Sequence, residues 1–267
     1  MNDRIIGCVG PAGGPGVTTV AAQMASAFSR HGVDTVLVDF DMDGSPLTLA
    51  FGATDNSGMS NLYELGELAM PGDDALALAL QPAGDHLRVV SGFSNLELGP
   101  EFRPAIGVRV ITAIAANCDV CILDMGRPRL WNVLDVLKSL DIICWVVTPT
   151  PEGMWAWRRM WNTFDGKGVP KQKMVAVINQ YNHPRALQNL PQDWAARYAI
   201  PVVARVPYSP KLSPDALFRP RFGRAASRNE KECAKAYDSF VNKVAGDLDT
   251  YQATFTTNGG KRRWRSR

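Results

Sequence analysis

Short apolar runs alternate with helical segments along most of the chain. Seven of these runs are apolar at nearly every position, which is typical of strands in a parallel sheet covered on both faces. Helical stretches separate most of them, as βαβ units require. The pattern predicts an α/β protein with a mainly parallel sheet of seven strands, or eight, and helices on both faces. The predicted strands are residues 4–10, 35–41, 86–92, 119–126, 141–147, 173–179 and 200–207.

Two helical stretches are marked clearly by their apolar faces. In the first, Val20, Met24 and Phe28 fall on one face and Gly32 ends the helix. In the last, an apolar stripe runs through residues 233–248, and we expect it to pack on the sheet. The chain is therefore predicted to form one domain, residues 1–255, followed by a basic tail, residues 256–267.

Cysteine usage and hydropathy indicate the compartment. The five cysteines are odd in number and scattered, and no signal peptide is evident, so we expect a reducing cytoplasm. Cys118 and Cys121 are two residues apart, but no second pair or nearby histidine completes a zinc set. No apolar run approaches the ~20 residues of a membrane span. We expect a cytoplasmic protein, soluble or peripheral at the inner membrane face.

The charge is distributed unevenly. The net charge is +3, but residues 201–267 hold 14 Lys/Arg and 6 Asp/Glu, so the first 200 residues carry −5. Two interpretations of the tail remain open: a solvated disordered segment, or a tether to anionic membrane or DNA in which the tryptophan inserts or stacks. The tail residues concerned are Lys261, Arg262, Arg263, Trp264 and Arg265.

A glycine-rich turn, VGPAGGPGVTTV at residues 9–20, joins the first predicted strand to the first helix. Such a turn directs backbone N–H groups at a phosphate, assisted by the helix dipole. Thr18 stands where a phosphate loop places its magnesium-binding hydroxyl, but Val17 replaces the lysine that reaches the β and γ phosphates. Pro15 removes one N–H. The loop is a candidate phosphate cradle without its usual cation.

Acidic residues follow two other predicted strands. Asp39, Asp41 and Asp43 end the second, and Asp124 ends the fourth. Because the carboxyl ends of parallel strands share one edge of the sheet, we expect these carboxylates beside the glycine loop. Such a group would serve a magnesium ion and an attacking water.

Five segments in order resemble the ParA/MinD group of deviant-Walker P-loop ATPases, over roughly residues 4–250. The stretch at residues 39–52 is most similar to the branch that localises Tad-type pilus machinery (TadZ/CpaE-like). The resemblance implies a P-loop NTPase-like fold, ATP or ADP with Mg²⁺ as the cofactor, and dimers across the nucleotide face. The five segments are GPAGGPGVTT, VLVDFDMDGSPLTLAFG, DVCILDMG, VAVINQ and IPVVARVPYSPK.

The resemblance also assigns roles to individual residues. The family's signature lysine falls on Ala12 and its phosphate lysine on Val17, so both are absent. The family's water-positioning aspartate falls on Asp41, the candidate catalytic residue. Magnesium ligands fall on Thr18, Asp39 and Asp124. The implied nucleotide-binding residues are Gly13, Gly14, Gly16, Thr18, Thr19, Asn179, Pro207 and Tyr208.

The missing lysines determine the expected activity. Phosphoryl transfer depends on positioning and charge neutralisation, and the loss of such a catalytic cation costs on the order of 10³-fold in rate. We therefore expect a pseudo-ATPase that binds ATP weakly or not at all and hydrolyses it negligibly. The alternative is an active partition-type ATPase in which Arg127 or Arg129, just past Asp124, replaces a lysine.

The segment TPTPEGMWAWRRMW, residues 148–161, concentrates large side chains in one predicted helix. Trp155, Trp157 and Trp161, with two methionines, exceed what one buried face normally uses, and Trp, Met and Arg are enriched in interface cores. We predict a partner or homodimer surface, with ordinary core packing as the alternative.

Taken together, the sequence favours a ParA/MinD-like positioning or scaffold protein. Its expected partners are proteins of a pilus, secretion or other membrane-associated assembly, and its cargo could also be DNA. A DNA- or membrane-binding module that uses the basic C-terminal region is the alternative from a different class.

Overall fold

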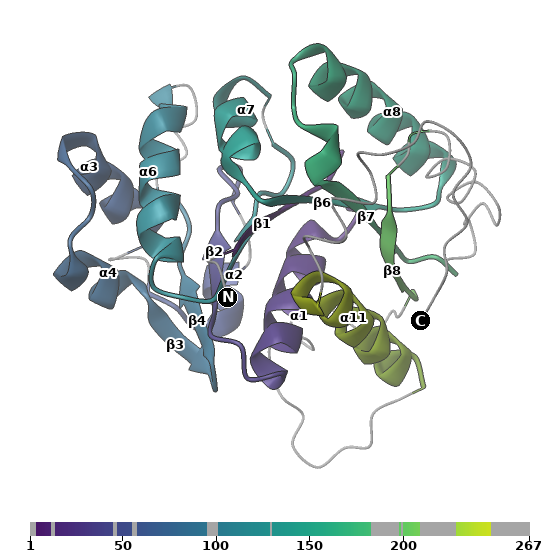
Figure 1. The fold of residues 1–267 in the computed structure, drawn as a ribbon, viewed down its shortest axis with the longest axis horizontal. Coiled ribbons are helices and arrows are strands. Elements are labelled where there is room, and N and C mark those ends of the chain that lie inside the picture. Colours follow the sequence, from purple (N-terminus) through teal and green to yellow (C-terminus); the bar gives the residue numbers. More distant parts are fainter. Residues whose placement is uncertain are drawn as a thin grey trace.

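A computed structural model describes nine stretches of the chain (Figure 1). The described stretches are residues 4–11, 14–44, 47–54, 58–94, 101–128, 130–182, 198, 200–208 and 228–246.

The centre of the molecule is an eight-stranded sheet in the order β3-β4-β2-β5-β1-β6-β7-β8. Every neighbouring pair is parallel except β3 and β4. The strands are β1 (Arg4–Val9), β2 (Thr35–Asp39), β3 (Gln81–Gly84), β4 (Leu87–Val90), β5 (Val120–Asp124), β6 (Ile142–Val147), β7 (Met174–Asn179) and β8 (Val202–Val206).

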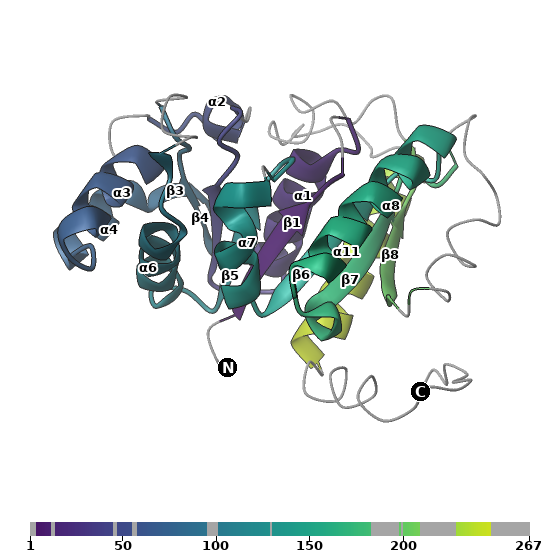
Figure 2. The ribbon, with the colours of Figure 1, turned by 90° about the horizontal axis from the view of Figure 1, so that it is seen from above.

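Helices cover both faces of the sheet, and each face has its own apolar core (Figures 1 and 2). One core unites the sheet with α1 (Val17–Arg30), α2 (Leu47–Phe51) and α11 (Arg228–Gly246). The other core lies under the helices of the opposite face. A short 3-10 helix, Lys171–Lys173, directly precedes β7. Those helices are α3 (Met59–Leu68), α4 (Asp73–Ala79), α6 (Pro104–Ala115), α7 (Leu130–Ser139) and α8 (Pro151–Gly166).

The predicted α/β class and mainly parallel sheet are confirmed, and all seven predicted strands are present. The sheet has the eighth strand that the sequence left as an alternative. Its sequence, QPAG, is unlike a buried strand, because proline cannot donate to a ladder and is confined mostly to sheet edges. β3 lies at the edge of the sheet and pairs antiparallel with β4, with an irregularity between Pro82 and Gly84.

Among the described helices, none is both long enough and apolar enough to cross a membrane.

Candidate functional site

The ends of the central strands bring the predicted site together. The register aligns Cys8 of β1 with Asp124 of β5, and Asp124 with Asp39 of β2. Backbone bonds continue past the strands: the Gly10 N–H donates to the Gly126 carbonyl at 2.9 Å. The glycine loop after β1 therefore leaves the sheet directly beside the two carboxylates. This is the carboxyl edge where parallel α/β sheets bind ligands.

The glycine loop passes into α1 through a left-handed backbone conformation that glycine adopts more readily than other residues. Gly16 is the N-cap of α1, with φ 82° and ψ 38°. A Cβ at Gly16 would lie 2.6 Å from Nδ2 of Asn179, so a side chain there would also collide with β7's last residue. The first turn of α1 then carries Val17, Thr18 and Thr19. The helix N-terminus thus faces the carboxyl edge of the sheet, as phosphate binding requires.

The lysine position of the loop is apolar and buried. Val17 is 6% exposed and belongs to the core between the sheet and α1. Thr18 and Thr19 are half-buried beside it, and Gly14 is exposed with φ 92°. A hydroxyl and backbone N–H groups are therefore available at the helix start, but the position that carries an ammonium group in the resembled family faces the core.

Asn179 ties the loop to the sheet. Its Nδ2 donates to the carbonyl of Pro15 at 2.7 Å, and its side chain is 5% exposed. Its Oδ1 in turn accepts from the N–H of Gln180 at 3.0 Å, where the chain passes through φ 56°. The residue predicted to lie near the adenine thus also holds the loop in place.

The carboxylates accept long hydrogen bonds from backbone N–H groups two residues further along the chain. Oδ1 of Asp124 accepts from the Gly126 N–H at 3.2 Å, and Oδ1 of Asp39 accepts from the Asp41 N–H at 3.4 Å. Gly126 has φ 51°, and a Cβ there would overlap the Asp41 carboxylate. The carboxylate of Asp41 therefore packs directly against the turn that follows β5.

Two further residues hold Asp39. The hydroxyl of Thr48, on α2, donates to Oδ2 of Asp39 at 3.4 Å and accepts from the Gly92 N–H at 3.1 Å. A Cβ on Gly92 would lie 2.9 Å from the Asp39 carboxyl carbon. Thr48, Gly92 and Gly126 are site residues that the sequence did not predict. The sequence does show that Gly92 and Gly126 follow strands, in VVSG and LDMG. It does not show which residues they contact, because those residues lie far away in the chain.

The donor set fits a magnesium ion better than a triphosphate. Asp39 and Asp124 are 1% and 0% exposed and lie side by side on neighbouring strands. Two neighbouring carboxylates repel each other, and a bound divalent cation would offset that repulsion. Carboxylate and hydroxyl oxygens are the ligands Mg²⁺ prefers. Among the described residues, however, no three His, Cys, Asp or Glu side chains are grouped for a metal, so waters, Thr18 or phosphate would complete the shell.

The part of β1 that leads into the loop, residues 5–9, carries no charged side chain. A hydrogen bond with Cys144 and complete burial raise the pKa of the Cys8 thiol well above its usual value. Cys8 faces Cys144 across the β1–β6 pair and contacts the Met24 sulfur at 3.8 Å. All five cysteines lie in the described part of the chain, where they are free and buried.

Pro207 and Tyr208 follow β8, at the same edge of the sheet. Pro207 is buried, and its carbonyl accepts from the Cys233 thiol at 3.8 Å, which links the segment to α11. The Tyr208 N–H donates to the side chain of Asn182, past the end of β7. Their predicted contact with a base stays a prediction.

Several predicted site residues lie outside the described part of the chain. Among them are Ala12 and Gly13 of the loop and Arg129 after β5. The whole basic tail also lies outside it: Lys261, Arg262, Arg263, Trp264 and Arg265.

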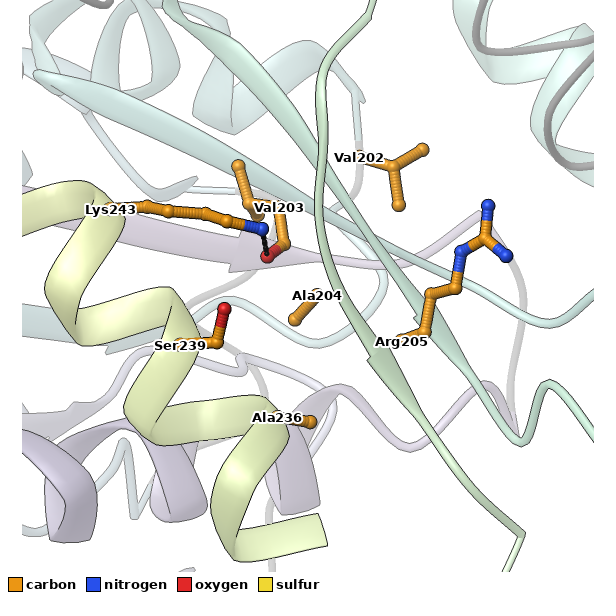
Figure 3. Close-up of a pocket in the computed structure, with 7 residues that line it drawn as sticks. All are labelled: Val202, Val203, Ala204, Arg205, Ala236, Ser239 and Lys243. Atoms are coloured by element: carbon orange, nitrogen blue, oxygen red, sulfur yellow. Dashed lines mark hydrogen bonds between the residues drawn. The ribbon is translucent and has the colours of Figure 1, made fainter. Parts of the chain in front are cut away.

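A separate cavity of about 230 Å³ lies between β8 and α11 (Figure 3). Lys243 reaches into it and donates to the Val203 carbonyl at 2.9 Å, whereas the Arg205 side chain points away from it. Burial, and then the charge of Arg205, lower the pKa of Lys243. None of the predicted nucleotide-site residues lines this cavity.

The structure corrects the predicted tryptophan surface. Trp157 and Trp161 are 0% and 5% exposed and lie in the core, stacked on each other with centroids 5.3 Å apart. Tyr198 packs against both. Of these three tryptophans, Trp155 alone is exposed, at 61%, with the Arg159 guanidinium 4.7 Å from its ring centroid. The helix buries two tryptophans rather than one because Trp145 and Tyr198 enlarge the aromatic core against which it packs.

A glycine loop between strand and helix, with carboxylates on neighbouring strand ends, defines a P-loop-type nucleotide-binding protein. The profile of the CobQ/CobB/MinD/ParA nucleotide binding domain matches residues 6–218. The chain therefore belongs to the CobQ/CobB/MinD/ParA family of nucleotide binding domains. Comparison with curated protein sequences gives no significant match.

Solved structures share the fold at low sequence identity. A ParA family ATPase from Chlorobium tepidum is 18% identical with a TM-score of 0.73, covering 89% of this chain and 98% of its own. The septum site-determining protein MinD from Pyrococcus horikoshii, complexed with Mg-ADP, is 19% identical with a TM-score of 0.70, covering 93% and 98%. A plasmid partition protein from Borrelia burgdorferi, bound to AMPPNP, is 15% identical with a TM-score of 0.70, covering 92% of this chain and 99% of its own. These matches support the confirmed fold.

Proposed function

We propose that this protein is a ParA/MinD-type positioning or scaffold factor whose nucleotide site no longer works as an ATPase. The carrying observation is the buried, apolar Val17 at the position of the phosphate lysine. The family's positioning role in partition and cell division supports the general function. The similarity of residues 39–52 to the Tad pilus branch favours a pilus or secretion apparatus as cargo, with DNA as the other candidate.

Electrostatics support the loss of turnover. Asp39 and Asp124 lie side by side at the edge of the sheet where the glycine loop leaves it, Asp41 packs against Gly126 there, and Val17 offers no compensating charge. A transition state with charge on three phosphoryl oxygens needs fixed cations. Mg²⁺ held by Thr18, Asp39 and Asp124 would supply one such charge, and the loop N–H groups would orient the phosphates. We propose weak binding of ATP or ADP with Mg²⁺ and negligible hydrolysis.

Nucleotide titration and turnover test this proposal directly. We expect the full chain with Mg²⁺ to hydrolyse ATP at a rate indistinguishable from its Asp41→Ala variant. We expect the double change Ala12→Lys and Val17→Lys to strengthen ATP binding at least tenfold, because it restores both ammonium groups. Turnover by the native chain that Asp41→Ala abolishes would refute the pseudo-ATPase.

A second candidate, an active ATPase with a substitute cation, has one observation in its favour. Arg127 is exposed and directly follows Gly126, the residue packed against the Asp41 carboxylate. If Arg127 replaces the lysine, Arg127→Ala should lower turnover by 10²-fold or more. Arg158, exposed on α8, provides the matched control, since its change to Ala removes the same charge outside the site.

Protein partners and self-association belong to the same proposal. Trp155 and its stacked Arg159 combine the two residue types most enriched in interface hot spots. In a solved structure from Aquifex aeolicus with 16% identity and a TM-score of 0.65, MinD forms a complex with MinC. We propose that the exposed face of α8 contacts a partner protein or a second copy.

A further inference from the structure

The hairpin of α3 and α4 exposes an unusual amount of apolar surface. Leu68 and Leu78 are 89% and 69% exposed, and Leu65 and Met70 are 40% and 55% exposed. Single exposed apolar residues are ordinary, but these four fall within fourteen consecutive residues. The two helices contact each other and lie at one end of the molecule in both views (Figures 1 and 2). We call these four residues the α3–α4 surface.

This surface lies in the most acidic part of the chain. Residues 32–85 contain ten acidic residues and no Lys, Arg or His. Glu64, Asp73 and Asp74 are exposed on the same hairpin, and Glu67 pairs with Arg103 of the loop before α6. A ligand for the α3–α4 surface should therefore combine an apolar anchor with positive charge.

The chain itself supplies a segment with this chemistry. Residues 261–267, KRRWRSR, hold five basic residues around one tryptophan, and residues 250–267 hold no acidic residue. Tryptophan and arginine are the two commonest anchors of protein interfaces. We propose that the C-terminal segment 261–267 docks on the α3–α4 surface of its own chain, with Trp264 on the leucines and the arginines near Glu64, Asp73 and Asp74. This proposal is independent of the nucleotide chemistry proposed above.

The connecting length is sufficient for this contact within one molecule. The last helix, α11, ends at Gly246, which leaves residues 247–260 as a fourteen-residue connection. Extended, fourteen residues span up to about 50 Å. A domain of this size is about 45–50 Å across. The Arg4 guanidinium donates to the Val244 carbonyl, so α11 ends beside β1 in the middle of the sheet rather than at its far edge.

Fluorine NMR of the full chain labelled with 5-fluorotryptophan tests the contact. The chain has seven tryptophans, and Trp264→Phe identifies the resonance of Trp264. We expect this resonance to differ from that of the isolated peptide 259–267. We expect it to move to the free-peptide position in Leu68→Ser/Met70→Ser and in about 1 M NaCl, where screening reduces the Debye length to about 3 Å.

Controls separate docking from unfolding and from other contacts. Leu49→Ser alters a residue that is 86% exposed on α2, outside the surface, and should leave the resonance in place. Glu64→Lys tests the charge without removing apolar area and should shift it towards the free position. The remaining tryptophan resonances report the fold in every variant. A free-peptide position in the native chain, or a position insensitive to both surface variants, would overturn the proposal. A shift that appears only as concentration rises would overturn its intramolecular form.

Discussion

At the residue scale, the site depends on glycines whose neighbours come from other strands. Gly126 combines a left-handed backbone with direct contact to the Asp41 carboxylate, so both the conformation and the space exclude a side chain. The position of each aspartate could be predicted from the sequence, because each ends an apolar run. The contacts of Gly126, Gly92 and Thr48 could not, because they join residues up to 85 positions apart in the chain.

Gly126→Ala should destabilise the protein by about 1–3 kcal/mol, because it adds backbone strain and displaces Asp41. Urea unfolding measures this change. Gly44→Ala is the matched control: Gly44 has φ 94° but no atoms within 4 Å of a new Cβ, so it reports strain alone. Equal losses in the two variants would show that the contact with Asp41 carries no cost.

At the element scale, α8 buries two of its tryptophans in the core and exposes the third to solvent. The helix begins at a capped N-terminus, where the Thr150 hydroxyl accepts from the Gly153 N–H at 3.2 Å. Its buried face then carries Trp157 and Trp161 into the core, and Trp155 points to solvent. At 100° per residue, the helical spacing separates Trp155 from Trp157 and Trp161, but it does not show how much aromatic area the opposite face buries.

Trp155→Ala should therefore affect association, whereas Trp157→Ala should affect stability. We expect Trp155→Ala to lower the apparent mass in light scattering, or to abolish capture of a partner, with stability unchanged within about 0.5 kcal/mol. We expect Trp157→Ala to cost about 3–5 kcal/mol in unfolding free energy, because it leaves a cavity in the core. A native chain that stays monomeric at high concentration and captures no partner would contradict the interface.

At the scale of the whole molecule, buried thiols couple stability to pH. Burial raises the pKa of the Cys233 thiol from 9.0 to about 11, and the pKa values of Cys8 and Cys121 are raised as well. Between these pH values the folded chain keeps a proton that the unfolded chain has lost. The stability contributed by such a thiol is complete below pH 9 and is lost as the pH rises towards 11.

In the native chain, the unfolding free energy should fall as the pH rises from about 9 to about 11. Cys233→Ala should make this slope less steep by up to about 1.4 kcal/mol per pH unit. Denaturant titrations under reducing conditions at several pH values measure the slope. Val241→Ala, in the same helix and 2% exposed, removes packing without a titratable group and should leave the slope unchanged. A slope identical in the native chain and Cys233→Ala would contradict the assignment.

The sequence by itself determined the class of fold, the order of strands and helices, and the edge of the sheet where acidic residues collect. These features follow from local periodicity and from the polar residue that ends each apolar run. Tertiary structure alone decided that Val17 is buried and that Asn179 binds the Pro15 carbonyl. It also decided that two of the three clustered tryptophans lie in the core and that the α3–α4 surface is exposed in the acidic part of the chain. Burial and contact depend on which distant segments the sheet register brings together, and no local pattern encodes that pairing.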